Sequence, residues 1–114
     1  MKKIILASAL AAAAITAHSA GSLTAGSNTV TTTAATGCEL ITASVTITLS
    51  TSNIGYYDCN SSAASIGLAV GNTSGKNKVY SLGSAGGAIT ETTLSAAPTT
   101  SNAQTQAQAK SASS

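Results

Sequence analysis

The chain has 114 residues, of which 7% are charged and 3% are aromatic, with no Phe and no Trp. This length allows one domain at most, and the excess of basic over acidic residues comes from Lys2 and Lys3. The composition excludes a nucleic-acid-binding protein, which needs clustered Lys and Arg. It also differs from the usual disordered class, which combines low hydrophobicity with high net charge.

Residues 1–19 have the layout of a secretory signal peptide. A short basic start precedes an apolar run at residues 4–15, and small residues follow this run. The run is too short to stay as a membrane span, because about 20 apolar residues are needed to cross a hydrocarbon core of ~30 Å. We expect cleavage after Ser19, no membrane span in the mature chain, and a bacterial protein that passes through the periplasm to the cell surface or the medium.

Residues 20–37 are rich in Thr, Ser and Gly, and Leu23 and Val30 are their only large apolar residues. This N-terminal arm fits an edge strand, a flexible arm or a segment that becomes ordered only in an assembly. Within it, residues 29–33 are a weak strand candidate because they are rich in β-branched side chains.

Cys38 and Cys59 are the only cysteines of the chain. In an exported protein, a pair of cysteines most simply forms one structural disulfide. A zinc site lacks ligands, since no His follows the signal peptide. A redox pair would have the much closer Cys-x-x-Cys spacing.

The segment from Cys38 to residue 97 shows repeated strand patterns. Alternation of apolar and polar residues, β-branched side chains and Gly/Asn/Ser-rich turns are typical of antiparallel strands. These patterns predict an all-β domain, a small meander or sandwich of five or six strands. The clearest predicted strands are residues 41–49, 66–70, 78–82 and 88–94, and the second and third of these form a hairpin.

Residues 98–114 follow the only proline, Pro98, and contain no large apolar side chain. Such a segment buries too little surface to offset the entropy lost on ordering. We therefore expect a disordered tail rich in Ser, Ala and Gln.

The mature chain lacks the side chains of common catalytic sites. It has no His and no Arg, and its acidic residues are Glu39, Asp58 and Glu91. A Ser-His-Asp or Cys-His site is impossible without an imidazole. The turns match no phosphate-binding motif. We expect no enzyme activity, no catalytic residue, no metal site and no cofactor.

Two groups of residues are candidates for contacts with other molecules. Val45, Ile47 and Leu49 alternate with Thr in an uncharged strand, which would recruit another strand if it formed an exposed edge. Tyr56 and Tyr57 lie beside Cys59, where they either cap a thin core or form a contact patch, because tyrosine is common in both settings.

These observations predict an exported structural subunit of a bacterial filament, pilus or surface layer that associates with itself, or with other surface subunits, through β-strands. The Thr-Gly-Cys at residues 36–38 with a second Cys at a strand end resembles chaperone–usher pilins in outline, although the chain is short and has no motif specific to that family. The alternative is a small secreted monomeric binding module such as an adhesin, an inhibitor or an ice-binding protein.

Overall fold

A computed structural model describes residues 18–34 and 37–112. Within these residues the chain forms seven strands and one helix. The elements are β1 (His18–Leu23), β2 (Gly26–Val30), β3 (Val45–Leu49), β4 (Asn53–Asn60), β5 (Ser65–Asn72), β6 (Lys78–Gly83), β7 (Thr90–Thr93) and α2 (Thr100–Ser111).

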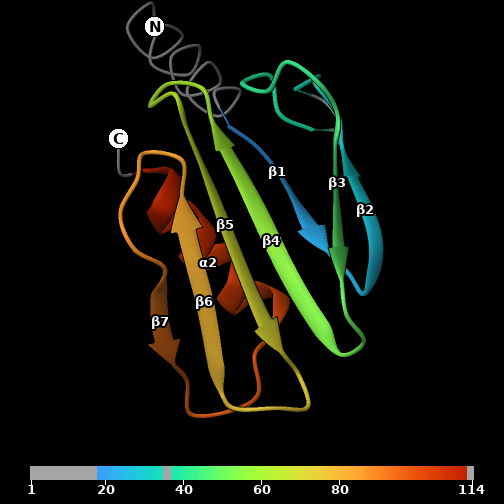
Figure 1. Ribbon diagram of the computed structural model, residues 1–114. Helices are drawn as coiled ribbons and strands as arrows, with labels where there is room; N and C mark the ends of the chain where they lie inside the picture. The colour runs from blue at the N-terminus through green and yellow to red at the C-terminus, as the bar shows by residue number, and fades with distance from the viewer. Residues whose placement is uncertain (1–17, 35–36, 113–114) are drawn as a thin grey trace, which may run out of the picture.

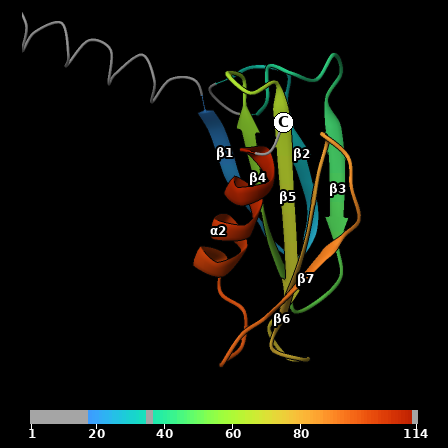
Figure 2. The same cartoon turned by 90° about the vertical axis from the view of Figure 1, so that its left-hand side faces the viewer.

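The strands form two antiparallel sheets. One sheet has five strands in the order β1-β4-β5-β6-β7, and the other is the β2–β3 hairpin. Figures 1 and 2 show three layers, with α2 on one face of the five-stranded sheet and the hairpin on the other. Strands β4 and β5 therefore lie between two layers: β4 carries buried residues on both faces, and β5 is buried on the α2 face and half-buried on the face towards the hairpin.

The structure confirms a mostly β fold with antiparallel sheets and one disulfide. The predicted hairpin is also confirmed, as β5 and β6 pair from Gly67 with Gly83 to Gly71 with Val79. The predicted strand at residues 41–49 is shorter than expected and begins at Val45. The disulfide at Cys38 and a hydrogen bond from Ile41 N to Cys38 O hold the preceding residues in a turn.

The N-terminal arm is an integral part of the sheets. Strand β1 pairs with β4, and β2 pairs with β3. Of the alternatives for this arm, the edge strand matches the structure. Residues 1–17 of the predicted signal peptide lie outside the described residues, whereas His18 and Ser19 belong to β1.

The predicted disordered tail is wrong, because residues 100–111 form α2. Thr99 caps the helix: its side chain accepts a hydrogen bond from Asn102 N, and Asn102 Oδ1 accepts one from Thr99 N. Small side chains at helical spacing, Ala103, Ala107 and Ser111, are fully buried against the sheet. The helix needs no large apolar residue, because the sheet beneath it is lined by small residues.

The last turn of α2 also makes polar contacts with the sheet. Ser111 Oγ donates a hydrogen bond to the buried carboxylate of Asp58 in β4. Near this end of the helix, Lys110 Nζ donates to Thr90 Oγ1 in β7. The last turn of α2 is therefore tied to both a central strand and an edge strand.

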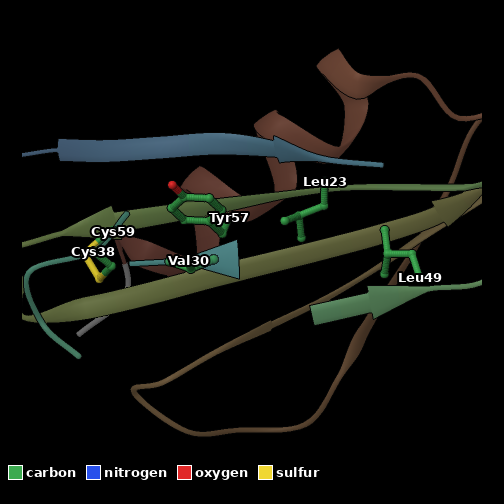
Figure 3. Close-up of a cluster of buried hydrophobic side chains, with 6 residues drawn as sticks. All are labelled: Leu23, Val30, Cys38, Leu49, Tyr57 and Cys59. Atoms are coloured by element: carbon green, nitrogen blue, oxygen red, sulfur yellow. A yellow bond between two sulfur atoms is a disulfide. The ribbon is translucent and has the colours of Figure 1, made fainter. Parts of the chain in front are cut away.

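The larger core lies between the two sheets. Its buried members are Leu23, Val30, Cys38, Leu49, Tyr57 and Cys59. Figure 3 shows the disulfide at one end of this cluster and Leu49 at the other, with Tyr57 between them. The disulfide joins the segment before β3 to β4, so it ties the hairpin covalently to the five-stranded sheet.

Candidate functional site

The large apolar side chains that are exposed in the described residues gather on one face of the molecule. Tyr80 and Leu82 of β6 are 45% and 42% exposed, Val45 of β3 is 45% exposed, and Ile89, just before β7, is 65% exposed. Tyr80 and Leu82 lie opposite Val70 and Leu68 of β5, on the side of the sheet that faces away from α2. We call this surface, formed by β3, β6, residue 89 and β7, the open face.

The open face results from a mismatch in width between the two sheets. The hairpin has two strands and the sheet behind it has five. The described core between the sheets takes residues from β1, β4 and β5, and none from β6 or β7. The five-stranded sheet therefore extends beyond the hairpin that covers it, and the apolar side chains on this face of β6 are exposed to solvent.

A small apolar cavity opens where the hairpin stops. Its volume is about 120 Å³. Ligand pockets usually measure ~300–1,000 Å³, whereas an apolar cavity of ~150 Å³ holds a molecule as small as benzene. The cavity therefore has the size of one apolar side chain or a very small apolar molecule. It is lined by Val30, Cys38, Ile41, Val45, Ile47, Tyr57, Ile66 and Leu68.

The edge of β3 borders this cavity. Strand β3 pairs with β2 on one side only, and Figure 1 shows it on the side of the hairpin nearer to β5 and β6. Its apolar residues change from buried to exposed along the strand, since Leu49 is buried, Ile47 half-buried and Val45 exposed. Of the candidate self-assembly residues, Val45 and Ile47 thus line the cavity, and Leu49 is buried in the core.

The two candidate tyrosines lie on opposite faces of β4. Tyr57 is buried between the sheets, with its ring over Gly21 of β1, where a Cβ would lie 2.9 Å from the ring. Tyr56 packs on the α2 side of the sheet, against the cluster that contains Ala103. The two side chains therefore belong to two cores and do not share one surface.

Burial raises the pKa of the Tyr57 hydroxyl, and the neighbouring Tyr56 adds to the effect when it is ionised. A raised pKa in the folded state stabilises the fold below the unfolded value of about 10, and this contribution is lost as the pH rises through the folded pKa. We expect the protein to lose stability above pH ~10, as the Tyr57 hydroxyl ionises, and an ultraviolet titration should follow that ionisation. Tyr57→Phe should remove much of this alkaline sensitivity, whereas the exposed control Tyr80→Phe should retain it.

The open face carries one ion pair. Lys78 Nζ on β6 contacts Glu91 Oε1 on β7. Their hydrogen bond raises the pKa of Lys78 and lowers the pKa of Glu91. Both groups therefore stay charged and neutralise each other over the normal pH range, so the face has no net charge from this pair.

The described residues contain no group of three or more His, Cys, Asp or Glu side chains able to hold a metal ion. Among the same residues, no helix has the length and apolar character that crossing a bilayer requires. Asp58 is engaged by Ser111 and Glu91 by Lys78. Both carboxylates are therefore already engaged within the described structure.

Three residues of the open face were not singled out from the sequence: Tyr80, Leu82 and Ile89. The signal was present in the predicted strand at residues 78–82, which has apolar side chains on both faces. Val79 is fully buried under α2, so Tyr80 and Leu82 form a second apolar side. A strand of this kind implies cover on both sides, and the described residues supply it on the α2 side only.

Comparison with protein-family models, with curated proteins and with solved structures finds no match to this chain.

Proposed function

We propose that this protein is an exported structural subunit of a bacterial surface assembly, which joins other subunits through β-strand contacts. The observation that carries the proposal is the open face, where a free strand edge, an apolar cavity and the exposed large apolar residues occur together. Soluble monomers rarely leave a long, flat, apolar edge uncovered. The leader and the disulfide support export to a non-reducing compartment.

The exposed apolar surface and the size of the cavity favour the structural subunit over the monomeric binding module. A monomeric binding module remains stable with its face exposed, and its cavity would have to hold a ligand. At about 120 Å³ the cavity is small for most ligands. A partner strand, by contrast, can place a side chain in the cavity and bond to the edge of β3.

The test compares the exported protein with a variant that has a charge in the open face. Leu82→Lys should abolish association in sedimentation experiments, because burying an unpaired charge is costly. The circular dichroism spectrum should not change. Gln108→Lys on the exposed side of α2 is the matched control and should associate like the unmodified protein. Monomers of the unmodified protein at every concentration would overturn the proposal.

A further inference from the structure

The open face is bordered by two free strand edges, one in each layer of the molecule. The edge of β3 belongs to the hairpin layer, and the edge of β7 belongs to the five-stranded layer. Figure 1 shows that β6 and β7 lie beyond the edge of β3, on the side of β5 that is away from the hairpin. A partner that covers this strip of β6 and β7 must therefore meet an unpaired strand on each side.

Burial of the strip alone is too small to hold a partner. Two strands spaced ~4.8 Å apart, about six residues long at ~3.3 Å per residue, give roughly 200 Å² of flat surface. A stable interface buries about 800 Å² on each partner. The partner must therefore bury further surface and form main-chain hydrogen bonds, and both are available at the two free edges.

We infer that the partner is a second copy of this chain, related by a two-fold axis parallel to the strands; this inference rests on the proposed function and names its partner. This rotation exchanges the two layers, so it places β7 of the second copy beside β3 of the first, and β7 of the first beside β3 of the second. Each hairpin is thereby extended by the five-stranded sheet of the other copy. The two open faces meet and cover each other.

Strand direction and charge agree with this arrangement. Figure 1 shows β3 and β7 running in the same direction. A two-fold axis parallel to the strands preserves direction, so the two new pairs are parallel. Strand β3 carries no charge, and the carboxylate of Glu91 on β7 is already paired with Lys78. No unpaired charge is therefore brought into the contact.

This contact would bury all four exposed apolar residues. Tyr80 and Leu82 face the same residues of the second copy across the two-fold axis. Ile89, the most exposed of the four, precedes β7 and therefore lies next to β3 of the second copy, where Val45 and the cavity are. This contact would give a closed pair of chains, as an isologous interface does.

A different pairing, β3 with β3 of a second copy about an axis perpendicular to the sheets, does not fit the structure. It would keep both five-stranded sheets in the same layer. Because β6 and β7 extend beyond β3 on that side, the two copies would overlap there. The pairing of β3 with β7 avoids this clash because the layers are exchanged.

The test uses thiol cross-linking between two variants of the full exported chain, whose native cysteines are both in the disulfide. Thr48 on β3 is exposed and Thr92 on β7 is half-buried, and each lies on the face of its strand that is turned away from the contact. A mixture of Thr48→Cys and Thr92→Cys chains, treated with a short thiol-specific cross-linker, should give a mixed dimer as its main product. Thr105→Cys on the exposed side of α2 replaces Thr92→Cys as the control and should give about tenfold less.

The outcomes separate this inference from the proposed function. A main product of Thr48→Cys chains linked to each other, or association with no link between β3 and β7, would overturn the two-fold arrangement and leave the structural subunit standing. Monomers throughout would overturn both. A main product that joins β3 to β7, and that disappears when Leu82→Lys is added, supports both.

Discussion

Replacing Cys38 and Cys59 together by Ala is expected to lower the free energy of unfolding by about 3 kcal/mol, the value for a closed loop of roughly this length. The sequence separation of the two cysteines is 21 residues. The effect is large for this chain because the disulfide connects the hairpin layer to the five-stranded sheet. Urea unfolding followed by circular dichroism and tyrosine fluorescence measures the change.

The local consequences should be concentrated in the hairpin. Val30, Cys38 and Tyr57 are neighbours in one core, so loss of the disulfide loosens the cover over Tyr57. We expect a weaker near-ultraviolet tyrosine signal and a lower pKa for Tyr57 in the double variant. A reducing agent should destabilise the unmodified protein and leave the double variant unchanged. A loss of less than about 1 kcal/mol would contradict the assigned role.

The β character and the disulfide were predictable from local patterns. Strands β5 and β6 follow from alternation with a Gly/Asn-rich turn between them, and the pairing of Cys38 with Cys59 follows from their number. Strand β4 was missed because its two faces are both buried, so Tyr56 and Tyr57 show no alternation of polarity. Strand β1 was anticipated only through the edge-strand alternative for residues 20–37, because its small residues give little strand signal, and the ring of Tyr57 lies over its Gly21.

The open face could be predicted only in part. The uncharged segment that forms β3 was predicted as a candidate self-assembly strand, because its pattern is local; that role stays a prediction. Which edge of β3 is free, and which strip of the larger sheet lies next to it, depend on the order of strands in two sheets. The exposure of Tyr80, Leu82 and Ile89 next to β3 depends on this long-range arrangement and cannot be predicted from local sequence.

The helix α2 shows the limit of counting large apolar residues. Residues 100–111 have none, yet Ala103 and Ala107 are fully buried. Burial of an alanine is possible here because the facing residues of the sheet, Gly67 and Ala69, are equally small. The stabilisation comes from close approach of the helix backbone to the sheet, and one chain segment read alone cannot reveal it.

Gly67→Ala is expected to have the second large effect, because Gly67 is the position where the backbone of α2 comes closest to the sheet. A Cβ at Gly67 would lie 1.9 Å from the carbonyl oxygen of Ala107 and 2.8 Å from Ser111 N, both backbone atoms of α2. Replacing a strand glycine by alanine ordinarily stabilises a protein by ~0.5–1 kcal/mol. Here the overlap forces α2 away from the sheet, so we expect a loss of about 3 kcal/mol, at the upper end of overpacking effects.

The helix should not survive this displacement, because an isolated helix of fewer than ~12–15 residues is marginal in water. The helical part of the circular dichroism spectrum should therefore decrease, and the chain should become cleavable by protease within residues 100–111. Ser81→Ala is the control in the same interface. It removes a fully buried hydroxyl that has no hydrogen-bond partner, so it should keep or raise stability. An unchanged helical signal in Gly67→Ala would show that small residues in β5 are not what allows α2 to pack.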